Sequence, residues 1–429
     1  MLKSIRSLLK KTNNIKRSSY IWNSVNASFS AAESALILMV LNRTNGMYDA
    51  GIFSIAYAIG SLMLHLGQFG IRKFQSSDVL ERYSFGEYYA MRYITCAAMM
   101  IASLAYCIFG TVVRGYTPDK FAVIMLMCFV RCIQAFSDVF HGRMQQKGRL
   151  DVATKCSFFR YVMEVVSFSL MLILTHNLVV SATACAVSSF IVFLFTSLNA
   201  AVDFCELKPG LTPDRFKKLF LEGFPLFLSL FLNMYLSNAP KYAIDAYLTE
   251  EIQATYNLIF MPAYVVQLVA LFIFNPILTT YAELWVKGEM KTLGRLIRRQ
   301  MLVIVALTIL GLIVAATIGI PVLSFVFNAE LSDYKKELCI VMVGGGLLAF
   351  SVFFTTVITI IRLHNTLIVS YGVAAIAAYA FSGFFVKNYG IRGATMLYVL
   401  IMAVLTVLLG IIMFTKLRRA SAVKDEING

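Results

Sequence analysis

The stretch MCFVRCIQAFSDVFHGRMQQKGRLDVATKCSFFRYVMEVV, residues 127–166, reads as the end of one apolar helix, a short basic turn and most of a second apolar helix. Arg131 and Asp138 interrupt the first apolar run, and Arg160 and Glu164 interrupt the second. A charged side chain at the centre of a bilayer costs about 3 kcal/mol or more, so it normally faces protein or water. The stretch therefore predicts a hairpin inside a membrane protein that has a polar interior.

The composition of the whole chain supports a membrane protein. Hydrophobic residues make up 59% of the 429 residues, charged residues only 14%, and the mean hydropathy is +0.75. Ordinary globular chains carry about 25% charged residues. The apolar residues come in blocks of about 20, which is long enough for a helix to cross a bilayer. Alternation at period 2, the pattern of a membrane β-barrel, is absent. We predict an all-α polytopic membrane protein.

Twelve spans can be placed, six in each half of the chain. They cover 20–41, 50–70, 88–110, 120–140, 153–174, 178–202, 223–247, 252–281, 301–325, 338–361, 366–386 and 393–414. The predicted organisation is a basic amphipathic segment (1–19), a first lobe (20–202), a cytoplasmic linker (203–222), a second lobe (223–414) and a cytoplasmic tail (415–429). The first segment is either a short helix on the inner membrane face or a basic tail.

The Lys and Arg residues set the orientation. With the N-terminus inside, the cytoplasmic segments hold 26 of the 38 and the external segments hold six. Positive residues gather on the cytoplasmic side of membrane proteins, so both termini are expected there. The same rule explains the net charge of +15 without a nucleic-acid partner. Eight cysteines lie in or beside apolar runs without a set of metal-ligand partners, so we expect neither disulfides nor a metal site.

A weak internal repeat accompanies the six-plus-six division. Phe136-Ser137 recurs as Phe350-Ser351, and Ala182-Thr183 recurs as Ala394-Thr395, at offsets that differ by two residues. The pattern favours a duplication with parallel halves, which transporters often show. Pro262 and Pro276 lie in the long eighth span and predict kinks there. These two prolines are either hinges or static bends.

The charges of residues 127–166 allow two interpretations. Arg131 and Glu164 both lie near the predicted midplane, where they could meet, while Arg160 and Glu164 are spaced i,i+4 on one face. Asp138 lies closer to the cytoplasm. In the first interpretation these residues neutralise one another as a structural clip. In the second, the arginines bind an anionic substrate and the carboxylates Asp138 and Glu164 tune them or carry a coupling ion.

Other polar residues within spans are also candidates. Glu33, in the first span, could bind a coupling cation or sugar hydroxyls, or pair with a basic side chain. The seventh span carries a polar stripe that is either a sugar-binding surface or a solvated helix end, formed by Asn233, Asn238, Lys241 and Asp245. Of these, Asp245 is an ion-coupling candidate. Three cations near span ends are expected to reach lipid phosphate by snorkelling: Arg92, Lys120 and Lys155.

Several segments resemble the polysaccharide-biosynthesis flippases, which translocate O-antigen or capsule units within the superfamily that includes multidrug and toxic-compound extruders. They are the basic start, YDAGIFSIAY at 48–57, NAPKYAID at 238–245 and GIPVLSFVFN at 319–328. The resemblance implies two six-helix lobes around a central cavity that opens alternately to each face. It also implies a substrate made of an oligosaccharide on an undecaprenyl pyrophosphate carrier, moved to the periplasmic leaflet of the bacterial inner membrane.

The resemblance further implies no cofactor, with coupling to H+ or Na+ left open. Expected partners are the lipid-linked oligosaccharide, membrane lipids and other polysaccharide-assembly proteins. Two alternatives follow from the residues. The first is an ion-driven drug or metabolite antiporter of the same fold, which would need an acidic cavity to bind organic cations. The second is a membrane polymerase or glycosyltransferase, which would need a large external loop with catalytic residues. The sequence contains no enzyme motif.

Overall fold

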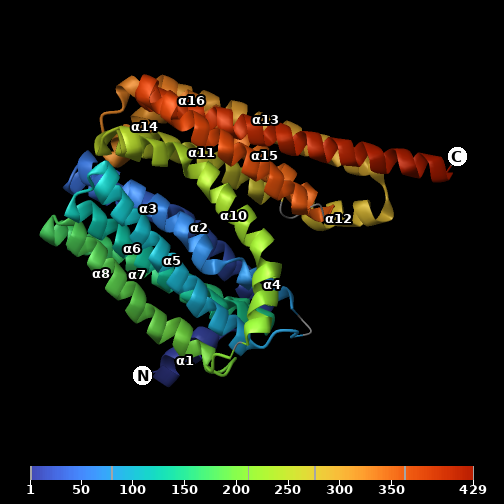
Figure 1. Cartoon of the computed structure of the whole chain (residues 1–429), viewed down its shortest axis with the longest axis horizontal. Coiled ribbons are helices and arrows are strands. Elements are labelled where there is room, and N and C mark those ends of the chain that lie inside the picture. Colours follow the sequence, from blue (N-terminus) through green and yellow to red (C-terminus); the bar gives the residue numbers. More distant parts are fainter. Residues whose placement is uncertain (1, 79–80, 211, 275–276, 362–363, 429) are drawn as a thin grey trace. The chain divides into compact units, whose positions relative to one another are not determined.

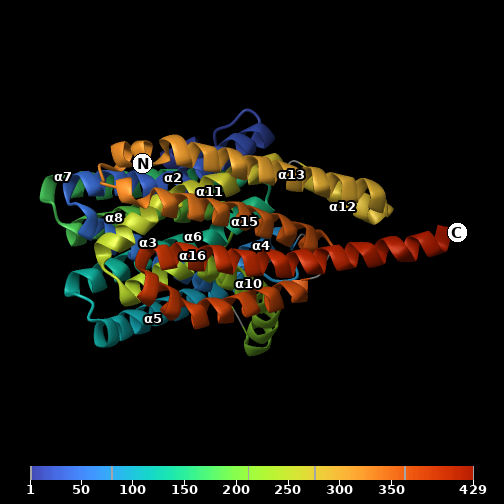
Figure 2. The same cartoon turned by 90° about the horizontal axis from the view of Figure 1, so that it is seen from above.

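The computed structural model describes residues 2–78, 81–210, 212–274, 277–361 and 364–428. These residues are almost entirely helical, and none of them forms a strand. Figures 1 and 2 show long helices that lie side by side in bundles. An all-α architecture was predicted from the composition and is confirmed.

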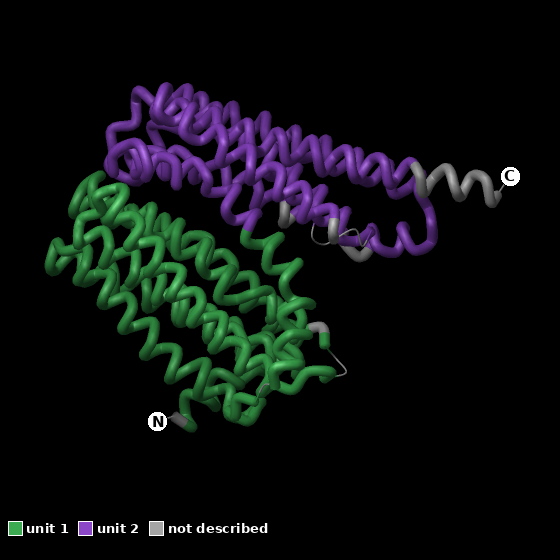
Figure 3. Tube along the Cα trace, in the orientation of Figure 1, with its two compact units in different colours: residues 1–231 green, residues 232–429 purple. Residues whose placement is uncertain are grey.

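The chain divides into two compact units, residues 1–231 and 232–429 (Figure 3). The division falls inside one helix, α10 (Pro213–Tyr247). The start of α10 means that residues 213–222, predicted as part of a linker, are helical. The functional boundaries of the predicted lobes and of the linker remain predictions.

Unit 1 contains the first six predicted spans and a short helix before them. Its elements are α1 (Leu2–Lys10), α2 (Ile15–Thr44), α3 (Met47–Gln68), α4 (Ile71–Ser77), α5 (Phe85–Arg114), α6 (Pro118–Gln146), α7 (Leu150–Thr175), α8 (Leu178–Phe193), the π-helix η1 (Leu194–Leu198) and α9 (Asn199–Ala201). The segment 1–19 is thus split between α1 and the first turn of α2. Its contact with a membrane remains a prediction.

Local sequence signals fix where these helices begin and end. Helix α5 starts with a capping box, in which the Ser84 and Glu87 side chains each bond the other residue's backbone N–H. It ends at Gly115, whose φ of 68° is the left-handed conformation that glycine adopts without strain. Helix α6 starts after Thr117, which caps it, and Pro118 fills its first turn.

Helix α6 lies at the centre of unit 1. It packs against α3, α5, α7 and α8, and α2 packs against α7 (Figure 2). In α3 and α6, most residues of the apolar segment are buried. In α2, α5 and α7, most residues of the apolar segment are not buried. Charges on α6 are therefore held inside the protein, where other side chains must compensate them.

Unit 2 repeats this arrangement around α15. Its elements after α10 are α11 (Glu250–Phe274), α12 (Leu278–Lys287), α13 (Met290–Val314), the π-helix η3 (Ala315–Gly319), α14 (Ile320–Phe327), the 3-10 turn η4 (Ser332–Tyr334), α15 (Lys335–Ile360) and α16 (His364–Asn428). Helix α11 packs on α15 and α13, just as α3 packs on α6 and α5. The shared packing supports the duplication that the sequence indicated.

Eleven helices within the described residues are long and apolar enough to cross a membrane. The last of them, α16, is 65 residues long and breaks at Gly390, where φ is 56°. Gly390 lies between the predicted spans 366–386 and 393–414, so α16 contains both of them. The twelve predicted spans are therefore consistent with the eleven long helices. The cytoplasmic placement of the termini remains a prediction.

Candidate functional site

Arg131 of α6 and Glu33 of α2 form a buried ion pair in unit 1. Arg131 Nη2 lies 3.1 Å from Glu33 Oε2, and both residues are at least 97% buried. The Tyr57 hydroxyl of α3 donates to the same carboxylate oxygen at 3.1 Å. The guanidinium also lies over the Tyr57 ring, 4.4 Å from its centroid. Helices α2, α3 and α6 thus meet at one charged group.

A glycine makes room for the Arg131 side chain. Gly60 of α3 faces it, and a Cβ atom at this position would lie 3.2 Å from Arg131 Cγ and 3.4 Å from the Met127 carbonyl oxygen. This spacing is tighter than an ordinary van der Waals contact. The small residue therefore lets α3 approach α6 closely while a large cation stays between the helices.

A second ion pair lies on α7, next to the first. Arg160 and Glu164 are one helical turn apart and form a salt bridge with both side chains buried. Ser189 of α8 donates to Glu164 Oε1 at 2.5 Å. The Arg160 guanidinium lies 4.5 Å from the centroid of the Tyr161 ring. Each arginine of the site is therefore paired with one carboxylate and stacked on one tyrosine.

An amide connects the two pairs. Arg131 Nη1 donates to Gln134 Oε1 at 2.8 Å, and Gln134 Nε2 donates to the Tyr161 hydroxyl at 3.0 Å. Three atoms of the two pairs are buried without a hydrogen-bond partner among the described residues: Arg131 Nε, Arg160 Nε and Glu164 Oε2. A buried polar atom without a partner is costly. The cluster thus retains capacity to bond a ligand, an ion or water.

Arg131 and Glu164, which could have met near the midplane, each form an ion pair with another residue. Arg131 faces α2 and α3, where Glu33 is its partner, and Glu164 is paired with Arg160 of its own helix. The i,i+4 relation of Arg160 and Glu164 was predicted from their spacing and is confirmed. Sequence reasoning missed Tyr57, Gln134 and Tyr161. The signal for two of them was adjacency, because Gln134 is one turn after Arg131 and Tyr161 follows Arg160.

Asp138 belongs to a separate network, nearer the C-terminal end of α6 than Arg131. The predicted clip in which Arg131, Asp138, Arg160 and Glu164 neutralise one another is therefore wrong for Asp138. Arg72 Nη1 donates to Asp138 Oδ1 at 3.0 Å, and Arg92 Nη2 lies 3.6 Å from Asp138 Oδ2. Arg92 is fully buried and also bonds the Gly67 carbonyl oxygen. Its predicted snorkelling to lipid is therefore wrong, because α6 supplies a carboxylate inside the bundle.

Lys155 is also buried, because α1 covers it. Its ammonium donates to the Leu9 carbonyl oxygen at 2.9 Å, near the C-terminal end of α1, so its predicted contact with lipid phosphate is wrong. Helix ends leave such carbonyls unpaired, and a cation is favourable there. Lys120 is buried too, 4.4 Å from the centroid of the Tyr116 ring, so its predicted snorkelling is wrong as well.

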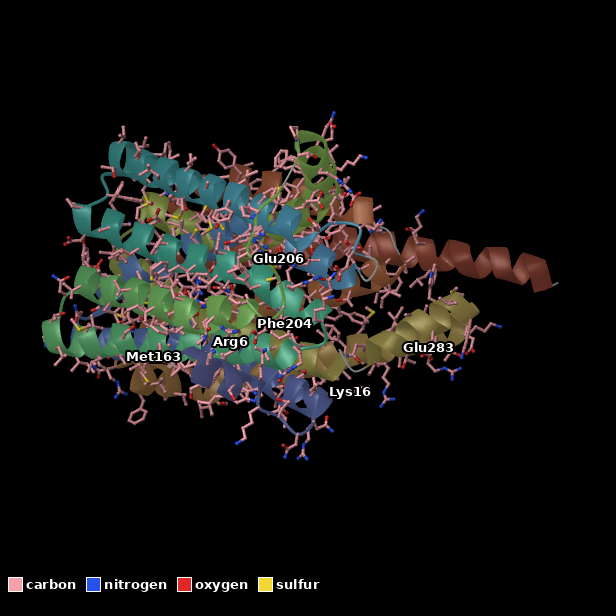
Figure 4. The ribbon with its side chains drawn as sticks, turned by 90° about the horizontal axis from the view of Figure 1, so that it is seen from below. Arg6, Lys16, Met163, Phe204, Glu206 and Glu283 are labelled. Carbon is pink, nitrogen blue, oxygen red and sulfur yellow. The ribbon has the colours of Figure 1, made fainter. Side chains whose placement is uncertain are left out.

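Asp203, which follows α9, also binds α1, through two basic side chains of that helix. It forms salt bridges with Arg6, at 2.6 Å, and with Lys10, and the Lys10 ammonium lies 5.0 Å from the centroid of the Phe204 ring. Arg6 and Phe204 are labelled in Figure 4 on the same side of the protein. The hydrogen bond from Lys10 lowers the pKa of Asp203, and Arg6 lowers it further.

In unit 2 the polar stripe of α10 is largely inside the protein. Lys241 and Asn238 are buried, and Asn233 is half-buried. The Lys241 ammonium lies 5.3 Å from the centroid of the Phe260 ring, and no described carboxylate lies within ion-pair distance of it. Asn238 donates to the Met234 carbonyl oxygen at 3.2 Å. The alternative of a water-solvated helix end is wrong for Asn238 and Lys241. Asp245 has a partly buried position on the same helix.

Of the two hinge candidates, Pro262 and Pro276, only Pro262 lies within the described residues. Pro262 lies inside α11, where it cannot donate a backbone hydrogen bond. Pro276 lies outside the described residues. All eight cysteines are free thiols, and no group of three or more metal-ligating side chains is found among the described residues.

One comparison identifies the family of this chain, and another identifies its fold. The model of the family described as polysaccharide biosynthesis protein matches residues 18–281. No curated protein matches the chain. Among solved structures, an inward-facing multidrug resistance MATE family transporter of the MOP superfamily superposes with a TM-score of 0.66 at 14% identity, covering 94% of this chain and 98% of that one.

Two further solved structures are similar over nearly their whole length. The Vibrio cholerae MATE transporter VcmN in its bent form has a TM-score of 0.59 at 11% identity, covering 98% of this chain and 99% of its own. A MOP superfamily transporter from Pyrococcus furiosus, described as having a binding pocket of reverse polarity, has a TM-score of 0.54 at 15% identity and covers 98% of each chain. At these identities the likeness establishes a shared fold.

Proposed function

Because the chain belongs to the family of polysaccharide biosynthesis proteins and has the fold of MOP superfamily transporters, we propose that it is a flippase for a lipid-linked sugar. Its substrate is an oligosaccharide repeat unit of the O-antigen or capsule type on undecaprenyl pyrophosphate. The protein moves this unit from the cytoplasmic to the periplasmic leaflet of a bacterial inner membrane by alternating access. Other polysaccharide-assembly proteins supply and consume the substrate.

The observation that carries this proposal is the pair of buried arginines in unit 1. A pyrophosphate cannot leave water without compensating charge, because an unpaired buried anion is prohibitively costly. Arg131 and Arg160 are held by hydrogen bonds and tyrosine rings in a fixed orientation, and each retains an unpartnered Nε. The planar guanidinium matches phosphate oxygens with two parallel hydrogen bonds.

The remaining candidates have supporting roles in this proposal. Glu33 keeps Arg131 in place and competes with the substrate for it, so substrate binding and ion binding at Glu33 are linked. Asp138, Glu164 and Asp245 are the groups at which H+ or Na+ would couple. Lys241, Asn233 and Asn238 offer a cation and amides to the sugar in unit 2.

The second candidate function is ion-driven export of a drug or metabolite. It is favoured by the likeness to multidrug resistance transporters. Organic cations need an acidic site, whereas the carboxylates Glu33 and Glu164 are already paired with arginines. The Pyrococcus furiosus relative has a pocket of reverse polarity, so polarity differs among proteins of this fold. The arginines favour an anionic substrate for this chain.

Deletion of the gene, followed by analysis of the lipid-linked intermediate, tests the proposal. Intact spheroplasts and inverted vesicles are treated with a glycosidase that cannot cross the membrane. The proposal predicts that the intermediate accumulates and is cleaved only in inverted vesicles, and that wild-type protein restores cleavage in spheroplasts. Cleavage in spheroplasts of the deletion strain, together with altered drug sensitivity, would favour the antiporter instead.

A further inference from the structure

A groove of about 570 Å³ lies in unit 1, away from the arginine site. Its lining residues belong to α5, to the start of α10 and to Pro209, Gly210 and Thr212. The residues that line it are mostly apolar: Ala90, Tyr93, Ile94, Pro209, Gly210, Thr212, Pro213 and Phe216. None of them contributes to the buried ion pairs described above.

The two walls of the groove contact each other directly. The Gly210 N–H donates to the Gly86 carbonyl oxygen at 3.1 Å, and a Cβ atom at Gly86 would lie 2.7 Å from the Lys208 carbonyl oxygen. Arg215 Nε forms an ion pair with Glu87 Oε1 at 3.3 Å. The two walls are therefore attached to each other at several points, and the groove is part of the folded unit.

The groove borders an exposed apolar face of α5. Ile94 lines the groove, and Ile101 and Ile108 follow at intervals of seven residues on the same face of α5. All three side chains are exposed on the outside of the bundle, in a helix apolar enough to span a membrane. A hydrocarbon chain lying along this face would end in the groove.

A lysine, Lys217, lies next to the α10 residues that line the groove. Pro213, Phe216 and Lys217 share one face of α10, because they are spaced i, i+3 and i+4. Lys217 is exposed, and no described acidic side chain forms an ion pair with it. The charge asymmetry of the loops predicts that residues 203–222 lie at the cytoplasmic membrane surface, where lipid phosphates lie. An apolar groove with a lysine beside it is complementary to a phospholipid, because the groove can hold an acyl chain and the lysine can bind the phosphate.

We propose that this groove binds an anionic phospholipid of the cytoplasmic leaflet, with one acyl chain along α5 and the phosphate at Lys217. The lipid fills the space between α5 and the segment that leads into α10. This binding does not depend on the sugar substrate, so it is tested separately from the proposed function.

Lipid binding to the purified full-length protein in detergent tests this proposal. Native mass spectrometry measures the affinity for phosphatidylglycerol and for phosphatidylcholine with the same acyl chains. Wild-type protein is expected to prefer phosphatidylglycerol. Because a surface lysine contributes about 1 kcal/mol toward an anionic lipid, Lys217→Gln should weaken phosphatidylglycerol binding about fivefold. Lys291→Gln, an exposed lysine of unit 2, is the matched control and should leave it unchanged.

A second pair of variants tests the groove itself. Ala90→Phe fills it and should weaken binding of both lipids, whereas Ala105→Phe makes the same change at an exposed position farther along α5 and should not. Equal effects of Lys217→Gln and Lys291→Gln, or wild-type binding by a folded Ala90→Phe protein, would overturn the proposal. Displacement of phosphatidylglycerol by an equal concentration of undecaprenyl phosphate would also overturn it, because the groove would then belong to the carrier lipid.

Discussion

Arg131 Nη2 and Glu33 Oε2 lie 3.1 Å apart, although 98 residues separate them in the chain. The contact joins α6, the central helix of unit 1, to α2 at its edge. Both charges are almost fully buried, so each depends on the other for compensation. Removal of one partner of such a pair is more destabilising than removal of both, because it leaves an uncompensated charge.

Arg131→Met should therefore lower the free energy of unfolding by about 3 kcal/mol or more. The double variant Arg131→Met/Glu33→Leu should recover most of that loss, since both charges are gone. Neither protein should transport, because the cation for the pyrophosphate is missing. Thermal unfolding in detergent and a transport assay measure the two effects. Full transport by the double variant would mean that the pair is only a structural clip.

Lys241→Met should separate stability from function in unit 2. The ammonium is buried against the Phe260 ring without a described carboxylate at ion-pair distance, so methionine can keep the packing without the cost of desolvating a charge. We expect an unfolding temperature equal to or above that of the wild type, and a loss of transport. Lys291→Met, at an exposed position, is the control for both measurements. A lower unfolding temperature with normal transport would assign Lys241 a structural role.

Docking of α1 should depend on pH through Asp203. The Lys10 and Arg6 contacts lower the pKa of this carboxyl below its ordinary value of 3.8. Its contribution to docking is therefore complete above pH 3.8 and is lost as the pH falls through the lower pKa of the folded protein. Hydrogen exchange of residues 2–10, measured as a function of pH, should show protection that disappears only in strong acid.

Asp203→Asn should remove much of that protection already at neutral pH. Glu206→Gln is the control, because Glu206 is exposed and its ion-pair partner is the exposed Lys208. Equal protection of α1 in wild type and Asp203→Asn at neutral pH would show that the two salt bridges do not hold the helix.

Pro262→Ala should reduce transport without reducing the amount of folded protein, if the interruption of α11 is a hinge. Alanine restores the backbone donor that proline lacks and stiffens the helix. Pro118→Ala provides a comparison, because Pro118 lies in the first turn of α6, where a missing donor has little consequence. Unchanged transport by Pro262→Ala would identify a static bend.

The sequence predicted which residues lie in helices far better than it predicted which side chains meet. Hydropathy identified the long apolar helices of the described residues, because a helix that crosses a bilayer must be long and apolar. The Arg160–Glu164 pair was predictable, since an i,i+4 spacing places two side chains on one face. Pairing of Glu33 with a basic side chain was one of its predicted alternatives. That the partner is Arg131 could not be predicted, because it depends on how α2 and α6 are rotated and which helices are neighbours.

The wrong predictions for Arg92 and Lys155 have a similar cause. Their positions near span ends suggested contact with lipid, which is the usual outcome for an isolated helix. In the folded unit, α6 brings Asp138 to Arg92, and α1 brings its terminal carbonyls to Lys155. Neither partner is close in sequence to the cation that it binds, so local patterns held no signal for these contacts.

Reconstitution in vesicles shows whether transport of the lipid-linked sugar requires the two buried arginines. The purified protein is placed in vesicles that carry a short undecaprenyl pyrophosphate oligosaccharide, and an external glycosidase reports which leaflet holds the sugar. Wild-type protein should make the inner-leaflet pool accessible to the glycosidase. Arg131→Met and Arg160→Met should fail to do so, and Lys291→Gln should behave as the wild type. Equal accessibility in vesicles with wild-type protein, with the arginine variants and with no protein would contradict the proposal.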